Sequence, residues 1–126
     1  MAEYLIRVRA HFEAAHHLTS YKGKPEPNHG HSWRVEAVLR AERLDDEGMG
    51  FDFIEAKRAL DSLVGRFHHR DLNSVPPFDR QSPTTEHVAE WLCAALQEKL
   101  SAAQVAELTL WEGPDCAVTY RPGGRA

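Results

Sequence analysis

Apolar and polar residues largely alternate along the stretch Tyr4-Leu5-Ile6-Arg7-Val8-Arg9-Ala10-His11-Phe12. Alternation with a period of two is typical of a strand with one buried face, because successive side chains point to opposite sides of a sheet. A second alternating stretch, residues 33–40, follows a polar loop that contains Gly23, Pro25 and Pro27. The two stretches predict a pair of antiparallel strands.

Two helices and two more strands are expected after this pair. Apolar residues recur at helical spacing from Phe53 to Phe67 and again over residues 88–100. The second of these stretches is preceded by Ser82-Pro83-Thr84-Thr85-Glu86, a sequence typical of a helix start. Closing strands are predicted over residues 106–111 and 117–121.

The order of these elements predicts an α+β fold. Strands and helices that are segregated along a chain favour an antiparallel sheet, here of four strands, with both helices on one face. At 126 residues the chain is expected to form one domain, residues 1–126. An open four-stranded sheet has two exposed edges, and oligomerisation through those edges is a natural way to cover them.

The composition excludes several classes of function. Fifteen Lys and Arg residues against nineteen Asp and Glu residues give a net charge of −4 with no basic footprint, so we expect no nucleic-acid partner. No apolar run approaches the ~20 residues that cross a bilayer, and residues 1–10 lack the apolar core of a signal peptide. We therefore expect a cytoplasmic protein with no membrane partner, in which Cys93 and Cys116 are reduced thiols.

Three histidines lie at the ends of the first strand pair: His16, and His29 with His31 in Asn28-His29-Gly30-His31. Side chains two residues apart on an extended segment share a face, so His29 and His31 can reach one ion, and His16 can join them from the neighbouring strand. Three imidazole ligands with an open fourth position are typical of catalytic zinc. The spacing alone leaves two interpretations open: a zinc (Zn2+) enzyme, and a chance cluster among eight histidines.

Several further motifs occur in order along nearly the whole chain: Phe12-Glu13-Ala14-Ala15-His16, Tyr21-Lys22-Gly23, His29-Gly30-His31, Asp52-Phe53, His69-Arg70-Asp71-Leu72-Asn73, Pro83-Thr84-Thr85-Glu86 and Trp111-Glu112. In these motifs the chain resembles the 6-pyruvoyltetrahydropterin synthases and the similar 6-carboxytetrahydropterin synthases of queuosine biosynthesis. The resemblance implies a tunnelling fold (ββααββ), in which sheets of three subunits join into a barrel, as a trimer or a homohexamer of two stacked trimers. It also implies zinc on His16, His29 and His31, and 7,8-dihydroneopterin triphosphate as the substrate.

The resemblance extends to the residues that bind the pterin. Glu112 matches a glutamate that anchors the guanidine-like edge of the pterin in that family, and a carboxylate can accept two hydrogen bonds from adjacent N–H groups. Thr84 and Thr85 match positions near the pterin. An alternative is that Thr84, Thr85 and Glu86 only cap the second helix.

The sequence departs from the family at its proton-transfer residues. The family places a cysteine base four residues before the first histidine of His-Gly-His, where this chain has Pro25. It also has an Asp-His pair where this chain has His68 and His69, and an imidazole orients a neighbouring imidazole more weakly than a carboxylate does. The resemblance carries a catalytic role to His69 with His68 beside it; the alternative is that both residues simply end a helix.

Glu26 is the candidate replacement for the cysteine. The string Tyr21-Lys22-Gly23-Lys24-Pro25-Glu26-Pro27-Asn28-His29-Gly30-His31 resembles a third type of this family, in which a glutamate takes the place of the cysteine. That type cleaves the side chain of dihydroneopterin triphosphate by a retro-aldol reaction and releases 6-hydroxymethyl-7,8-dihydropterin, a folate precursor. A carboxylate beside a metal can act as the base; the alternative is an exposed loop carboxylate between two prolines.

The sequence thus predicts a zinc-dependent pterin lyase whose site spans subunits. Its product is left open between hydroxymethyl, carboxy and pyruvoyl pterins. The alternative, motivated by Pro25 and His68, is a non-catalytic paralogue that binds a pterin or a purine-like ring. An unrelated zinc hydrolase is disfavoured, because no His-Glu-x-x-His motif accompanies the histidines.

Overall fold

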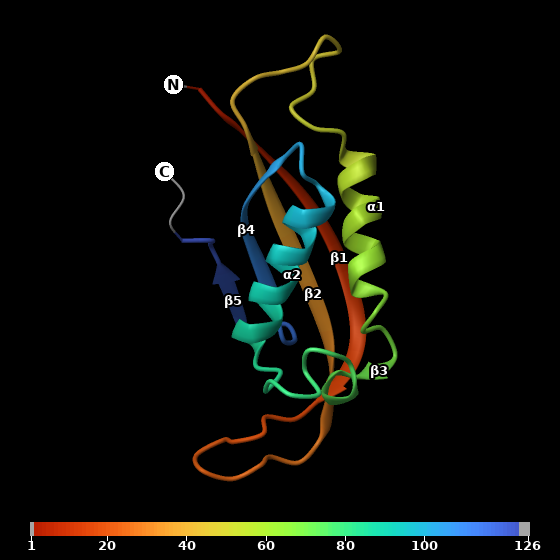
Figure 1. The fold of residues 1–126 in the computed structure, drawn as a ribbon, viewed down its shortest axis with the longest axis vertical. Coiled ribbons are helices and arrows are strands. Elements are labelled where there is room, and N and C mark those ends of the chain that lie inside the picture. The colour runs from red at the N-terminus through yellow and green to blue at the C-terminus, as the bar shows by residue number, and fades with distance from the viewer. Residues whose placement is uncertain (1, 124–126) are drawn as a thin grey trace.

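A computed structural model describes residues 2–123 of the chain as one sheet with two helices on one of its faces (Figure 1). The elements, in chain order, are β1 (Tyr4–His16), β2 (His29–Ala41), α1 (Phe53–Val64), β3 (Arg70–Asp71), a 3-10 helix η1 (Leu72–Ser74), α2 (Thr85–Lys99), β4 (Gln104–Trp111) and β5 (Ala117–Tyr120). This arrangement confirms the predicted α+β class.

The sheet has the strand order β3-β1-β2-β4-β5, and the four long strands pair antiparallel as predicted. The fifth strand, β3, was not predicted. It pairs parallel to the end of β1, where Ala14 lies opposite Arg70 and Ala15 opposite Asp71. Two residues carry no detectable alternation, so the sequence pattern contains no signal for this strand.

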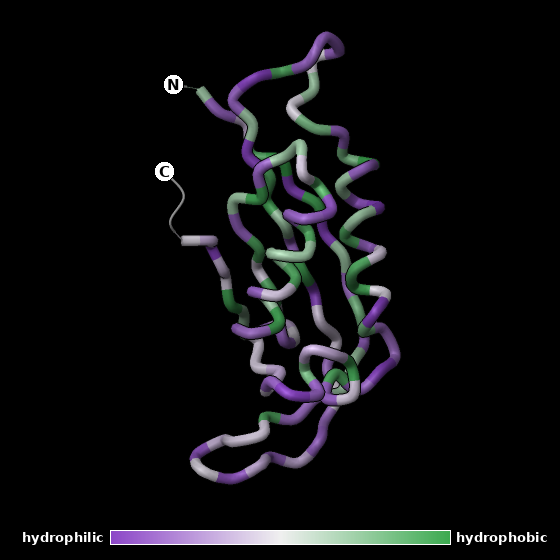
Figure 2. The backbone as a smooth tube through the Cα atoms, in the orientation of Figure 1, coloured by the Kyte–Doolittle hydropathy of each residue, from purple (hydrophilic) through white to green (hydrophobic). Residues whose placement is uncertain are grey.

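Alternation along β1 and β2 separates an inner from an outer face of the sheet. On β1 the even-numbered residues from Ile6 to His16 are buried, and the odd-numbered ones are more exposed. The core lies between this inner face and the two helices, and at its centre Phe12 and Trp33 stack with ring centroids 5.7 Å apart. Apolar residues gather on the strands and helices, whereas the loop between β1 and β2 is largely hydrophilic (Figure 2).

Both helices begin at a capping side chain. Asp52 caps α1, where its carboxylate accepts a hydrogen bond from the Ile54 N–H, and Thr84 caps α2, where its hydroxyl accepts one from the His87 N–H. The first helix ends at Val64, three residues before the predicted Phe67, because the chain passes through Gly65 into tighter turns. Phe67 still packs in the core, which explains its apolar spacing.

One end of the sheet collects segments that are far apart in sequence. The end of β1, the start of β2, the loop between them and the start of α2 lie together there (Figure 1). The three histidines marked for metal binding lie on these segments with Thr85, and Glu112 reaches them from the end of β4. No helix of the described residues is long and apolar enough to cross a membrane.

Candidate functional site

Three imidazoles meet at this end of the sheet. In the β1–β2 register His16 lies opposite His29, and Ala14 lies opposite His31, which places all three histidines on the inner face. Their ring centroids are 4.7 to 5.2 Å apart. His16 is buried with 1% of its surface exposed, and its ring meets Trp33 edge-on, so the cluster closes the end of the core.

Backbone carbonyls fix the orientation of two of these rings. His16 Nδ1 lies 2.8 Å from the Pro83 carbonyl oxygen, and His29 Nδ1 lies 2.8 Å from that of Pro27. A carbonyl can only accept, so each Nδ1 carries the proton and each Nε2 presents a lone pair. Burial lowers the pKa of His16, which keeps this imidazole neutral. This is the tautomer that binds a metal through Nε2.

Glu112 completes a group of four possible ligands. It follows β4, and its carboxylate lies 3.3 Å from His31 Nε2 and 3.6 Å from His16 Nε2. One ligand atom from each of the three histidines and from Glu112 lies within 4.8 Å of the others. Within residues 2–123, the buried Nε2 atoms of His16 and His31 have no hydrogen-bond partner. Unpartnered lone pairs that converge on one point fit a metal ion.

The start of α2 and the residue Pro83 just before it hold two members of this group in place. Thr85 donates a hydrogen bond of 2.8 Å from its hydroxyl to Glu112 Oε2, while the Pro83 carbonyl holds His16. Thr84 caps α2, so the structure contains the capping role that was the alternative to pterin binding for this residue. Thr85 instead points to the carboxylate that matches the pterin anchor.

Glu26 faces the same cluster from the loop between β1 and β2. Its side chain accepts a hydrogen bond from the Leu18 N–H at 2.9 Å, and its own N–H donates to the Leu18 carbonyl at 3.1 Å. Its carboxylate lies 3.8 Å from His29 Nε2. The Glu26 carboxylate is therefore partly buried beside the histidines, and the main chain of Leu18 holds it there. Cys93 lies buried in α2 and Cys116 is exposed before β5, so neither thiol shares this loop.

His68 and His69 lie elsewhere, on the turn between α1 and β3. The Glu13 N–H donates to His68 Nδ1 at 3.0 Å, and the His69 N–H donates to the Glu13 carbonyl at 2.6 Å. The two rings stack with centroids 3.7 Å apart, and His69 has a left-handed backbone with φ of 61°. Across the described part of the chain, no hydrogen bond or ring contact joins this pair to the clustered histidines.

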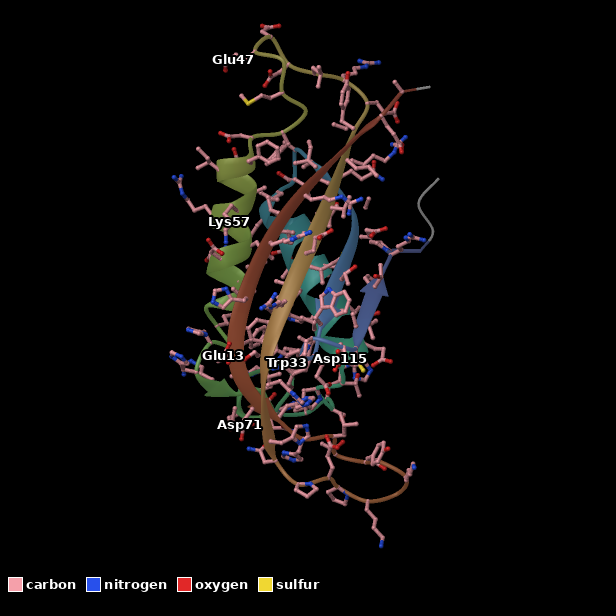
Figure 3. All side chains as sticks on the ribbon, turned by 180° about the vertical axis from the view of Figure 1, so that it is seen from behind. Glu13, Trp33, Glu47, Lys57, Asp71 and Asp115 are labelled. Atoms are coloured by element: carbon pink, nitrogen blue, oxygen red, sulfur yellow. The ribbon has the colours of Figure 1, made fainter. Side chains whose placement is uncertain are left out.

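The Glu13 side chain belongs to the outer face of the sheet, because Glu13 is three positions before His16 on β1, and residues an odd number of positions apart point to opposite faces. Figure 3 views this face and labels Glu13 on β1 and Asp71 on β3. The carboxylate accepts a 2.6 Å hydrogen bond from the Ser32 hydroxyl. A shallow groove lined by Glu13, Ser32, His69 and His31 lies at this end of the sheet, so His69 shares a groove with one of the three clustered histidines.

Sequence reasoning missed two residues that support the site. Asn73 clamps the main chain of His17: its side chain accepts from the His17 N–H at 2.9 Å and donates to the His17 carbonyl at 3.0 Å. This holds the end of β1 next to His16. The motif that contains Asn73 was visible, but its role was not. The Pro83 carbonyl has no sequence signal at all, because every residue has one.

Comparison with known proteins gives consistent results. The sequence model of the family described as 6-pyruvoyl tetrahydropterin synthase matches residues 5–123. A dihydroneopterin monophosphate aldolase of Pyrococcus furiosus is 32% identical over 90% of this chain and 93% of its own. A 6-carboxy-5,6,7,8-tetrahydropterin synthase of Synechocystis is 37% identical over 75% of this chain and 76% of its own. The solved Caenorhabditis elegans 6-pyruvoyl tetrahydropterin synthase superposes with a TM-score of 0.83 at 23% identity, covering 98% of both chains.

Proposed function

The chain belongs to the 6-pyruvoyl tetrahydropterin synthase family and has its α+β tunnelling fold, and from this premise we propose a specific reaction for it. Family membership makes it a pterin-processing lyase. We propose that it is zinc-dependent and cleaves the C6 side chain of a phosphorylated 7,8-dihydroneopterin by a retro-aldol reaction. The product is 6-hydroxymethyl-7,8-dihydropterin.

The observation that carries this proposal is the Glu26 carboxylate, 3.8 Å from His29 Nε2. A carboxylate is acceptor-only when ionised, so it can take a proton from a substrate hydroxyl held at the histidines. Pro25 has no ionisable group to offer in the same loop. The relative named dihydroneopterin monophosphate aldolase supports an aldol-type cleavage, and its name makes the monophosphate a substrate candidate beside the triphosphate.

The metal is assigned to His16, His29 and His31, whose lone pairs fit it as described above. Zinc, when bound there, would supply a Lewis acid that polarises the side-chain hydroxyl oxygens of the substrate. The protein contributes the orientation of the imidazoles through the Pro83 and Pro27 carbonyls. Hydrogen bonds that orient metal ligands in this way typically change metal affinity 10–100-fold when they are lost, and we expect an effect of about that size here.

Two proton transfers accompany the cleavage of the carbon–carbon bond. Glu26 removes the proton from the hydroxyl on the second side-chain carbon, and the bond between the first and second carbons breaks. The electron pair passes into the C6=N5 imine of the pterin, and the second carbon leaves as the aldehyde of a phosphorylated two-carbon fragment. A proton is then returned to the first carbon. We assign this step to His69 of a second copy of the chain, because no hydrogen bond or ring contact joins His69 to the clustered histidines within residues 2–123 of one copy.

The remaining predicted residues fit pterin recognition and assembly. Glu112 accepts hydrogen bonds from the pterin's guanidine-like edge, with Thr85 orienting the carboxylate. Thr84 contributes through the helix start that it caps. His68 positions His69 by stacking. The outer edges of β3 and β5 are open for pairing with neighbouring copies, consistent with a trimer or a homohexamer.

The test is incubation of the zinc-loaded protein with 7,8-dihydroneopterin monophosphate and, separately, triphosphate, with the pterin product identified by mass. We expect hydroxymethyldihydropterin, and we expect Glu26→Gln to lower kcat by about 10²- to 10⁴-fold with the metal retained. Glu47→Gln, on an exposed loop, is the matched control. A carboxy or pyruvoyl product would contradict the retro-aldol assignment. Pterin binding without any product would favour the non-catalytic paralogue, which the replacement of the family's aspartate by His68 also motivates.

A further inference from the structure

Glu112 lies close to two of the histidine ring nitrogens. Its Oε1 is 3.3 Å from His31 Nε2, and its Oε2 is 3.6 Å from His16 Nε2. We propose that Glu112 is the fourth metal ligand in the substrate-free protein, and that it exchanges this position for the pterin when substrate binds. This inference rests on the proposed metal site and adds a ligand to it.

The electrostatics of the group favour a positive charge between these atoms. His16 Nε2 carries a lone pair, because its Nδ1–H donates to the Pro83 carbonyl. That nitrogen is buried and lacks any hydrogen-bond partner within the described chain. A carboxylate that faces a lone pair at this distance is repelled by it, and on the His16 side little water screens the repulsion, because that nitrogen is buried. A cation shared by the three groups turns that repulsion into attraction.

The distances also agree with a shared ion. Zinc bonds to imidazole nitrogen and carboxylate oxygen of about 2.0–2.2 Å, set at tetrahedral angles, place neighbouring ligand atoms about 3.3–3.6 Å apart. The distance from Glu112 Oε1 to His31 Nε2, 3.3 Å, lies in that range, and the second carboxylate oxygen, Oε2, is 3.6 Å from His16 Nε2. The Glu26 carboxylate, at 3.8 Å from His29 Nε2, lies just outside it and keeps its hydrogen bond to Leu18 instead. Glu112 is thus the carboxylate placed as a ligand, and Glu26 is the one placed as a base.

Thr85 makes the exchange possible. Its hydroxyl donates to Glu112 Oε2 at 2.8 Å, so it holds one oxygen while the other, Oε1, faces His31. A substrate hydroxyl that takes the fourth position releases the carboxylate, which is then free to accept the N–H groups of the pterin edge. Recognition of the ring and opening of the metal site become one event. Without substrate the site is closed, which protects the ion from other ligands.

The first experiment measures metal binding without turnover. Zinc affinity by chelator competition and the visible spectrum of the Co2+-loaded protein are compared for the natural protein, Glu112→Gln and Glu107→Gln. Glu107 lies on β4, the strand that Glu112 follows, pairs with Arg121 and carries the same charge, so it is the matched control. We expect Glu112→Gln to weaken zinc binding at least about tenfold and to change the Co2+ spectrum, whereas Glu107→Gln changes neither.

The outcomes separate this inference from the proposed function. Unchanged affinity and spectrum in a folded Glu112→Gln protein would overturn Glu112 as a ligand and leave the three-histidine site intact. Failure of the natural protein to bind zinc or Co2+ would overturn the metal site itself. Thr85→Val is a second variant that keeps the carboxylate, and we expect it to weaken zinc binding less than Glu112→Gln does.

The exchange is tested with neopterin, the oxidised and unphosphorylated pterin that carries the same side chain. Added to the Co2+-loaded protein, it is expected to change the visible spectrum in step with its binding, which is followed by quenching of pterin fluorescence. An unchanged spectrum at saturating neopterin would overturn the exchange.

Discussion

Two groups of histidines lie at β1: the inner group, His16, His29 and His31, and the outer group, His68 and His69. They differ in the hydrogen bond that Nδ1 makes with the backbone. In the inner group, His16 and His29 donate from Nδ1 to carbonyl oxygens, so their Nε2 lone pairs face one another. At the turn after α1, His68 Nδ1 instead accepts from the Glu13 N–H, so its proton resides on Nε2. The same side chain is set as a metal ligand in one place and as a hydrogen-bond donor in the other.

The comparison shows that histidine spacing does not by itself assign function. Both groups contain neighbouring rings, with centroids 4.7 Å apart for His29 and His31 and 3.7 Å apart for His68 and His69. Only the inner group brings free lone pairs and a carboxylate together. In the outer group, His68 Nδ1 accepts a main-chain hydrogen bond, and the His68 ring stacks on the His69 ring. We therefore interpret His68 as a positioning residue and His69 as the residue available for proton transfer.

The largest expected effect is the loss of the inner group's metal. His29→Ala removes one of three imidazole ligands, and we expect zinc affinity to fall by more than about a hundredfold, because losing a contact that only orients a ligand already costs about 10–100-fold. Turnover should fall to background in the same preparation. Chelator competition and product analysis measure the two quantities. His11→Ala, on the exposed part of β1, should change neither. Turnover by metal-free His29→Ala would contradict the mechanism.

The inner group could be predicted from the sequence because it depends on strand geometry. The alternation through Phe12 and the pair His29 and His31 place three side chains on one face of two strands, and the structure has them there. Glu112 and Thr85 entered through the family resemblance, and the structure joins their two motifs by a hydrogen bond. The four long strands and both helices followed from periodicity alone.

The arrangement of His68 and His69 could not be predicted, although the resemblance named both residues, because it depends on main-chain hydrogen bonds and on an unusual backbone conformation. His69 has φ of 61°, which no sequence pattern indicates for a non-glycine residue. The two-residue strand β3 pairs with β1 through backbone atoms only. The contact between Glu112 and His31 was missed for a different reason: resemblance assigned the carboxylate to the pterin, and only atomic distances place it beside the metal ligands.

A second prediction tests whether the two groups cooperate across copies of the chain. Glu26→Ala and His69→Ala should each be inactive alone. Co-expressed in equal amounts, they should recover about one quarter of natural activity, because a site that takes each residue from a different copy is intact in one of four random combinations. Specific activity of the mixed assembly, with its composition checked by native mass spectrometry, measures this. No recovery in verified mixed assemblies would show that both residues act within one copy.

The smallest expected effect concerns His68, where hydrogen bonding and stacking can be separated. His68→Phe keeps an aromatic ring beside His69 but leaves the partly buried Glu13 N–H without its acceptor, which costs about 1–2 kcal/mol. His68→Asn offers an amide oxygen near the position of Nδ1 and should retain most of that stability while losing the stack. Urea unfolding of the metal-free proteins gives both free energies. Because neither change reaches the inner group, zinc affinity should stay natural in both, and kcat should fall further in His68→Asn, where His69 has lost the ring that orients it. A Phe variant as stable as the natural protein would contradict the role of the Glu13 hydrogen bond, and equal kcat in both variants would contradict positioning by stacking.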